Sequence, residues 1–317
     1  MVVLKEKWEK EGRGTIVGSN CSGKCRISFA MFADDTTLVA KSRAALKKML
    51  QDVSKGLAEI GLNLNADKCY IQSSTSAQAS TLQVEGASYP IVSNHVGFKV
   101  LGTTFTLNGS TDAEFERRMQ AAYGKFHQLW PLLGKRDTSL RKRLQLFQAT
   151  VSQSALWCCD SWTLTVAQKR HLRAVQRNLL RRFAGPRRKP DEDYLTWIRR
   201  ATPIVDKNAR EAGCECWLKQ YLSKKWDWAG KIARMSTERL TKRATFWRDS
   251  EWWRDQPRGG TAPLLRPMRP RPGRVSRWEN DLSKFASTKE WTSWQDKAKS
   301  EAAWNSSKEQ FIETTWR

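Results

Sequence analysis

The stretch Phe32-Ala33-Asp34-Asp35 places two adjacent carboxylates between two strand-like runs, Arg26–Phe32 and Thr36–Ala40. The two runs predict a β-hairpin with the carboxylates at its tip. Two divalent ions about 3.5–4 Å apart can hold the attacking and leaving oxygens of nucleotidyl transfer, and such ions need hard oxygen ligands. A solvent-exposed Asp-Asp turn is the more common reason for such a pair. The four residues alone therefore leave a metal site and a plain turn as alternatives.

The residues after this hairpin predict a helix and two further β-hairpin arms. Ser42–Ile60 has helical apolar spacing, at Leu46, Leu50, Val53, Leu57 and Ile60. Gly61 stands where a helix C-cap needs a left-handed residue. The following segments predict a turn leading into a strand, a pair of strands around Glu85-Gly86, and another hairpin arm: Leu62–Ile71, Leu82–Val92 and Val100–Phe105.

In this order, the Asp-Asp hairpin, the helix, the Leu-Asn-x-Asp-Lys turn at 64–68 and the x-Leu-Gly strand at 100–105 resemble the palm of reverse transcriptases, in particular those of non-LTR (LINE-type) retrotransposons. The resemblance implies that Asp34 and Asp35 are catalytic ligands of Mg²⁺ or Mn²⁺. It also implies that Lys68 lies near the departing pyrophosphate as a proton donor and that Leu101 and Gly102 belong to the primer grip. An RNA template and a DNA primer or target are the implied partners.

The chain after the palm predicts helices that resemble the thumb of the same family. Thr111–Glu114 has the sequence of a capping box. The apolar positions of the first two helices are Phe115, Met119, Ala122, Phe126, Leu129 and then Leu140, Leu144, Phe147, Val151, Ala155. A third helix is predicted over Ala167–Phe183. Two later segments also resemble family segments, Trp226–Met235 and Gly273–Leu282, with Lys231 and Val275 where His and Pro are usual.

A complete two-metal cage needs a third carboxylate, which the resemblance places on a strand before the Asp-Asp pair. The 33 residues before Asp34 contain no Asp, and their three Glu residues lie in a Lys-rich stretch that predicts an exposed helix or tail, at Glu6, Glu9 and Glu11. In this family the fingers position the incoming nucleotide. Orientation of the reactants can be worth ~7–11 kcal/mol of a barrier, so a chain without fingers would lose its activity. We expect a C-terminal portion of an RNA-directed DNA polymerase that is inactive alone, unless a separate upstream half completes it.

The charge of the chain independently indicates a nucleic-acid partner. The formal net charge is +24 on 317 residues, and residues 135–200 hold 16 Lys and Arg against five Asp and Glu. In the predicted helix 167–183, one face carries Arg170, Arg173, Arg177 and Arg181 and the opposite face Leu172, Val175, Leu179 and Phe183. The alternatives for this arginine stripe are a phosphate-binding surface and an ordinary solvated face. Arg187, Arg188 and Lys189 follow as further nucleic-acid-binding candidates or a nuclear-import patch.

Eleven of the 16 Trp residues lie from Trp217 onward, interleaved with Arg and Lys. Such Trp side chains can stack unpaired bases, or they can form a core. Trp226 falls on an apolar helical face with Leu218, Leu222, Ala229 and Ala233, so we expect it in the core. Residues 257–274 predict an extended basic linker rich in Pro, Arg and Gly. Residues from Trp278 to Trp304 predict a small terminal helical unit.

Several other sites are weakly supported. The seven Cys residues lack His partners at zinc-knuckle spacing, so no zinc is expected. The spacing from Asp191 to Asp206 is similar to that of a nuclease, but Asp193–Ile204 predicts a helix where the nuclease needs strands. No signal peptide or membrane span is apparent. We therefore expect a nuclear or cytoplasmic protein that is not secreted.

The sequence thus predicts an α+β fold with three parts. These are a truncated palm with an antiparallel sheet and a helix at 1–107, a basic helical thumb at 108–200, and a mostly helical, Trp-rich basic region at 201–317. Three functional hypotheses remain: a polymerase fragment, a non-catalytic RNA- or DNA-binding remnant, and a decayed element that folds poorly because its sheet has an unpaired edge.

Overall fold

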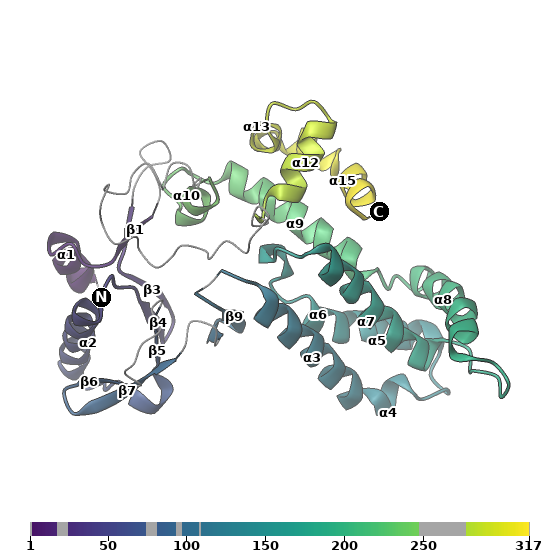
Figure 1. Ribbon diagram of the computed structural model, residues 1–317, viewed down its shortest axis with the longest axis horizontal. Helices are drawn as coiled ribbons and strands as arrows, with labels where there is room; N and C mark the ends of the chain where they lie inside the picture. The colour runs from purple at the N-terminus through teal and green to yellow at the C-terminus, as the bar shows by residue number, and fades with distance from the viewer. Residues whose placement is uncertain are drawn as a thin grey trace. The chain divides into compact units, whose positions relative to one another are not determined.

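The computed structural model describes residues 2–17, 25–73, 81–92, 97–107, 109–246 and 277–316. These residues form two compact units, shown as ribbons in Figure 1. Unit 1 comprises the described residues of Met1–Gly109 and Met235–Arg271, and unit 2 those of Ser110–Arg234 and Pro272–Arg317. The predicted linker at 257–274 lies outside the described residues. Unit 1 is α+β, and unit 2 consists of helices and connecting turns.

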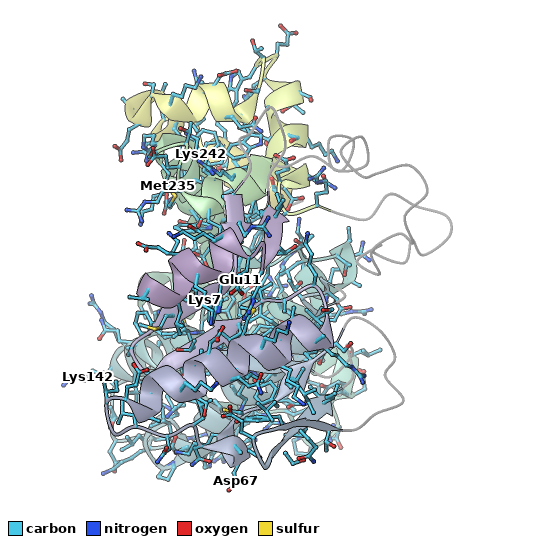
Figure 2. All side chains as sticks on the ribbon, turned by 90° about the vertical axis from the view of Figure 1, so that its left-hand side faces the viewer. Lys7, Glu11, Asp67, Lys142, Met235 and Lys242 are labelled. Atoms are coloured by element: carbon cyan, nitrogen blue, oxygen red, sulfur yellow. The ribbon has the colours of Figure 1, made fainter. Side chains whose placement is uncertain are left out.

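Two helices and a small apolar core organise unit 1. Helix α1 (Val2–Lys10) packs on α2 (Arg43–Ala58), and Trp8, Met49 and Val53 are buried between them. Lys7, labelled in Figure 2, lies 2.7 Å from Asp52, which also accepts a hydrogen bond from Trp8 Nε1 at 2.8 Å. The stretch expected as an exposed helix or tail is thus a helix, but its Trp8 docks it to the unit.

Helix α2 confirms the predicted helix and its ends. The Ser42 hydroxyl accepts a hydrogen bond from the Ala45 amide, and Gly61 has φ +73 in the left-handed region. Of the predicted apolar face, Val53 is buried and Leu57 packs against the same core, whereas Ile60 is 68% exposed; Met49, which was not predicted, is also buried. Ile60 lies beyond the last helical residue, so helical periodicity no longer holds there.

The strands of unit 1 form hairpins and one three-stranded sheet. β1 (Thr15–Val17) pairs with β2 (Cys25–Ile27), β3 (Phe29–Phe32) with β4 (Asp35–Leu38), and β8 (Phe98–Val100) with β9 (Thr103–Phe105), all antiparallel. In the sheet β5-β7-β6, β7 (Ala87–Val92) runs antiparallel to β6 (Thr81–Val84) and parallel to β5 (Ile71–Gln72). The 3₁₀ helix η1 (Ala66–Lys68) precedes β5, and α10 (Leu240–Phe246) belongs to the same unit. Lys242 of α10 donates a hydrogen bond to the Met235 carbonyl at 2.7 Å; both residues are labelled in Figure 2.

Unit 2 begins with the helices that the apolar spacing predicts. α3 (Asp112–Gln128) buries Phe115, Met119, Ala122 and Phe126. The predicted capping box at Thr111 is wrong: the Thr111 side chain donates to the Thr163 carbonyl, and Glu114 pairs with Arg117 and Arg118. A capping box does form at Thr165 and Gln168, at the start of α7 (Val166–Ala184).

The predicted second helix is divided at Thr150, whose hydroxyl donates to the Leu146 carbonyl at 2.6 Å. The helical elements between α3 and α7 are α4 (Trp130–Leu133), α5 (Leu140–Ala149), α6 (Val151–Ala155) and the 3₁₀ helix η2 (Cys159–Ser161). Leu144, Phe147, Val151 and Ala155 are buried as expected.

The rest of unit 2 is built around one long buried helix, α9 (Trp217–Arg234). After α8 (Tyr194–Glu211) and α9 come α12 (Asn280–Thr288), α13 (Trp294–Lys299), α14 (Glu301–Asn305) and α15 (Lys308–Trp316). The rings of Trp226 on α9 and Trp304 on α14 stack with centroids 3.6 Å apart. The C-terminal helices therefore share the core of α9 and do not form the small separate unit that the sequence predicts.

Candidate functional site

The carboxylates of Asp34 and Asp35 lie at the tip of the β3–β4 hairpin. Phe32 pairs with Asp35, so Ala33 and Asp34 form a two-residue loop. Ala33 has φ 51, a left-handed conformation of the kind that tight hairpin turns require. Both Asp residues are exposed. The predicted hairpin is confirmed, although the strand run before it is divided at Ser28.

Two carboxylates supply hard oxygen ligands of the kind that Mg²⁺ and Mn²⁺ bind. Within the part of the chain that the structure describes, no group of three or more His, Cys, Asp or Glu side chains could hold a metal. Two of the three earlier acidic residues are engaged locally: Glu9 lies 3.7 Å from Lys5, and Glu11 pairs with Arg13. The described residues thus fit part of a divalent-metal cage, and the metal assignment stays a prediction.

The other two predicted palm motifs are joined through Tyr70. Lys68 is exposed at the end of η1, two residues before Tyr70. The Tyr70 hydroxyl accepts a hydrogen bond from the Lys99 amide at 3.0 Å and donates to the Lys99 carbonyl at 3.4 Å. Leu101 and Gly102 form the loop of the β8–β9 hairpin that contains Lys99, with φ 49 and 75. The structure therefore ties the Lys68 turn to the predicted primer-grip hairpin.

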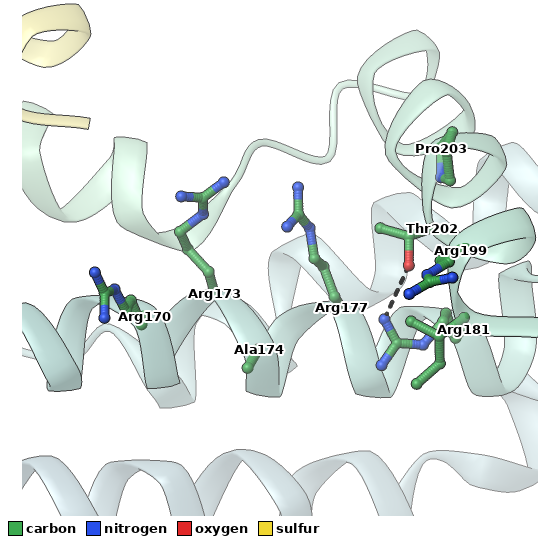
Figure 3. A pocket seen from close by; sticks show the side chains of 9 residues that line it. Arg170, Arg173, Ala174, Arg177, Arg181, Arg199, Thr202 and Pro203 are labelled. Atoms are coloured by element: carbon green, nitrogen blue, oxygen red, sulfur yellow. Dashed lines mark hydrogen bonds between the residues drawn. The ribbon is translucent and has the colours of Figure 1, made fainter. Parts of the chain in front are cut away.

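The arginine stripe of α7 lies along a hollow between α7 and α8, shown in Figure 3. We call this hollow, of about 620 Å³, the arginine pocket. Five guanidinium groups line it, together with Ala174, Ile198, Thr202 and Pro203: Arg170, Arg173, Arg177, Arg181 and Arg199. The opposite, apolar face of α7 is buried as predicted.

Neighbouring elements hold three of these arginines, which corrects the expectation of a wholly outward stripe. Arg177 makes a two-pronged ion pair with Asp206, at 2.6 and 3.3 Å. Arg181 donates to the Thr202 hydroxyl at 3.2 Å, and burial lowers the pKa of its guanidinium. The Arg173 guanidinium lies 4.1 Å from the ring centroid of Trp316. The pocket is still strongly cationic, because Asp206 is the one carboxylate paired with its lining arginines among the described residues.

Arg187, Arg188 and Lys189 are exposed in the turn between α7 and α8. The turn is fixed by the Arg200 guanidinium, which donates to the Arg187 carbonyl at 3.0 Å and forms a salt bridge with Glu192 at 2.6 Å. The hydrogen bonds from Arg200 lower the pKa of Glu192 to about 2. The three basic side chains therefore project from an ordered turn, and their role in binding remains a prediction.

The Trp residues divide between core and surface. Trp226 is buried as expected, and so are Trp217, Trp294 and Trp304. These four rings are unavailable for base stacking. The most exposed Trp residues among the described residues are Trp157 and Trp130, which are 51% and 43% exposed. Neither was singled out from the sequence.

Sequence reasoning also missed the partners that α8 brings to the pocket. Asp206 was considered as a nuclease ligand, but it lies on α8, which confirms the predicted helix over Asp193–Ile204. Arg199 and Thr202 carry no motif, and their role follows only from the packing of α8 on α7. Of the other motif candidates, Cys21 and His95 lie outside the described residues.

Residues 14–105 match the family described as reverse transcriptase (RNA-dependent DNA polymerase). The matched segment contains Asp34, Asp35, Lys68, Leu101 and Gly102. No solved structure matches this chain. No helix within the described residues is long and apolar enough to cross a membrane.

Two curated proteins are similar to this chain. An uncharacterized transposon-derived protein of Caenorhabditis elegans is 25% identical over 236 residues, which cover 70% of this chain and 77% of that protein. A retrovirus-related Pol polyprotein from the type-2 retrotransposable element R2DM of Drosophila melanogaster is 33% identical over 95 residues. This second match covers 27% of the chain but only 9% of the polyprotein.

Proposed function

We propose that the chain acts as part of an RNA-directed DNA polymerase of a non-LTR (LINE-type) retrotransposon. Residues 14–105 match the reverse transcriptase family, and the two similar curated proteins come from transposable elements. The observation that carries the proposal is the position of Asp34 and Asp35 at the tip of a two-residue hairpin inside the matched segment. The substrates would be an RNA template and a DNA primer or target.

Each palm residue has a proposed role that suits its position. Asp34 and Asp35 would hold Mg²⁺ or Mn²⁺, which when bound stabilises the attacking and leaving oxygens. Lys68, exposed on η1, would donate a proton from its Nζ toward the departing pyrophosphate. Leu101 and Gly102, at the tip of their own hairpin, would contact the primer strand.

We further propose that the chain binds its substrate without extending it when it is alone. Two carboxylates hold metal weakly, and the described residues contain no third ligand grouped with them. A third carboxylate would have to come from elsewhere, for example from a separately encoded upstream polymerase half. The polymerase fragment without such a partner would therefore behave as the second hypothesis states, as a non-catalytic RNA- or DNA-binding protein.

The arginine pocket supports the binding part of this function. Phosphate oxygens are bound by Arg through charge-assisted, often two-pronged hydrogen bonds. Five Arg side chains line one hollow, and among the described residues Asp206 is the one carboxylate that pairs with them. A polyanion is therefore the favoured ligand. The exposed Arg187, Arg188 and Lys189 would extend the same basic surface along a backbone.

The test is primer extension on an RNA template with Mg²⁺ and then with Mn²⁺, comparing the wild type with Asp34→Asn. The matched control is Glu59→Gln, which removes another exposed carboxylate of unit 1 outside the hairpin and outside the turn at 64–68. Binding to the same primer–template is measured in parallel over a range of salt concentrations. We expect no extension by any of the three proteins and salt-sensitive binding by all of them.

The opposite results are equally informative. Extension that is lost in Asp34→Asn and kept in Glu59→Gln would show a complete metal site and overturn the proposed inactivity. Absence of both extension and binding would refute the function as a whole. The third hypothesis, a poorly folding element, is separated by thermal unfolding, because a folded chain should melt cooperatively.

A further inference from the structure

A second hollow lies on unit 2 among residues of α3, of the short helix α4 and of α7. Its volume is about 360 Å³, and Phe126, His127, Trp130 and Arg182 line it. We call it the Trp130 hollow. None of its residues belongs to the arginine pocket or to the palm hairpins, so it is a separate feature of the molecule.

Trp130 is exposed but firmly seated. The residue is 43% exposed, and its ring centroid lies 5.5 Å from that of the fully buried Phe126. On another side the indole packs against Gly134, where a Cβ atom would lie only 3.2 Å from Cε2. An aromatic ring held in this way loses little conformational entropy when a ligand covers its exposed part.

The walls of the hollow are fixed by Arg143, a buried residue of α5. Its guanidinium donates to the carbonyls of Leu133 at 3.0 Å, Thr138 at 3.1 Å and Phe183 at 3.3 Å. Leu133 ends α4, and Phe183 follows Arg182 on α7, so these bonds join the two elements that carry Trp130 and Arg182. The hollow is therefore preorganised by buried contacts that do not depend on a ligand.

The charge of the hollow is positive. Arg182 is exposed, and no hydrogen-bond or ion-pair partner of its side chain occurs among the described residues. His127 supplies a second polar group, and the lining contains no carboxylate. An indole and an unpaired guanidinium that line the same hollow suit a ligand that has a flat ring and a negative charge close to that ring. A nucleotide unit has both, since its base can stack on Trp and its phosphate can bind Arg.

We propose that the Trp130 hollow binds an unpaired nucleobase of single-stranded nucleic acid, stacked on Trp130, with an adjacent phosphate on Arg182. A base pair inside a duplex is stacked on both faces and cannot cover the indole, whereas an unpaired base can, so the ligand is a single strand. Stacking on a ring does not distinguish ribose from deoxyribose, so RNA and DNA share the required chemistry. The site does not require polymerase activity.

The test is fluorescence anisotropy of the full chain with labelled ten-nucleotide probes at fixed salt. The probes are single-stranded RNA, single-stranded DNA, an abasic strand with the same number of phosphates, and a blunt duplex. The variants are Trp130→Ala, Trp130→Leu, which keeps apolar volume without an aromatic face, and Arg182→Gln. Leu132→Ala is the matched control, because Leu132 is 53% exposed on the same helix and does not line the hollow.

Both Trp130 variants should bind base-containing single strands about 5- to 150-fold more weakly, the range that corresponds to one stacked base. They should bind the abasic strand and the duplex like the wild type, and Leu132→Ala should match the wild type on every probe. Arg182→Gln should weaken binding to the abasic strand as well. A loss on only one of the two single strands would identify which of them is the ligand.

The proposal is overturned if Trp130→Leu binds base-containing strands normally, or if it loses affinity equally for the abasic strand. Thermal midpoints of all variants establish that they are folded, and Trp130→Leu carries the decision if Trp130→Ala is unstable. Asp34→Asn should leave the Trp130-dependent stacking unchanged. This result separates failure of the stacking site from failure of the proposed polymerase function.

Discussion

Lys225 Nζ lies 3.3 Å from Asp281 Oδ2, and Lys169 Nζ lies 3.1 Å from the same oxygen. Lys225 is almost fully buried on α9, so burial lowers the pKa of its amine, whereas the Asp281 charge opposes this shift. Burial also disfavours the charged form of Asp281, but the two lysines outweigh it and lower the pKa of its carboxyl group. This ion cluster joins α7, α9 and α12.

Removing the acid of this cluster should be more harmful than removing its buried base. Asp281→Asn leaves Lys225 buried without a counter-charge, a change that typically costs about 3–5 kcal/mol. Lys225→Met removes the buried charge and keeps the Asp281–Lys169 pair, so it should cost less. Urea unfolding followed by circular dichroism checks the order. Lys299→Gln, in an exposed pair 2.7 Å from Asp296, should change the free energy of unfolding by at most about 1 kcal/mol.

The same cluster predicts a pH dependence. Because the folded-state pKa of Asp281 is lowered, its ionised form stabilises the protein above the unfolded-state pKa of about 3.9, and this contribution is lost as the pH falls through the folded-state value. The difference in thermal midpoint between wild type and Asp281→Asn should therefore be constant from pH 7 to 5 and shrink below about pH 4. A difference that stays constant down to pH 3 would contradict the role assigned to Asp281.

Asp206 pairs with Arg177 in the arginine pocket, so under the proposed binding of phosphate its removal should strengthen binding. Asp206→Asn frees a guanidinium that is now held at 2.6 Å. We expect tighter binding of double-stranded DNA and a steeper salt dependence, by about 0.9 in the log–log slope if one more phosphate is contacted. The control is Glu211→Gln, which removes the same charge from an exposed position of α8. Equal effects of both variants would mean that net charge alone matters.

Two helical glycines should respond to alanine with opposite signs. At Gly230 an added Cβ would lie 2.7 Å from Trp304 Nε1, which donates to the Trp226 carbonyl at 3.0 Å. Gly230→Ala should therefore destabilise the protein by about 1–3 kcal/mol through overpacking. Gly124, inside α3, has nothing within 4 Å of such a Cβ, so Gly124→Ala should stabilise by about 0.5–1 kcal/mol. Thermal unfolding of the two variants side by side tests the pair, and a shift in the same direction for both would be inconsistent with this packing.

Local patterns predicted the elements well wherever neighbouring residues determine the backbone. The Asp34 hairpin, the Gly61 cap and the apolar face of α7 were all anticipated, because turn geometry and helical periodicity are properties of short segments. The capping box at Thr111 was predicted wrongly for two reasons. Tertiary packing brings the Thr163 carbonyl close, and it accepts the hydrogen bond of the Thr111 hydroxyl, while Glu114 pairs with Arg118 one turn further along the same helix. Local rules do not account for the Thr163 partner.

The candidate sites divide in the same way. The order of motifs along the chain, which needs no tertiary structure to be seen, indicated the candidates Asp34, Asp35, Lys68 and Leu101-Gly102. The arginine stripe was found from the helical wheel, but the Asp206 and Trp316 contacts that restrain it come from 29 and more residues away. Trp130 carried no signal at all, because its exposure depends on how α3, α4 and α7 meet.

The sequence by itself determined the motif order, the basic charge and the positions of helices and hairpins, since these depend on local sterics, periodicity and composition. Only the tertiary structure decided which cations stay available. Arg177 is neutralised by Asp206 and Lys225 by Asp281, whereas Arg182 has no partner among the described residues. The reason is physical: whether a charge is paired depends on distances of a few ångströms between residues far apart in the chain, and these distances are set by packing.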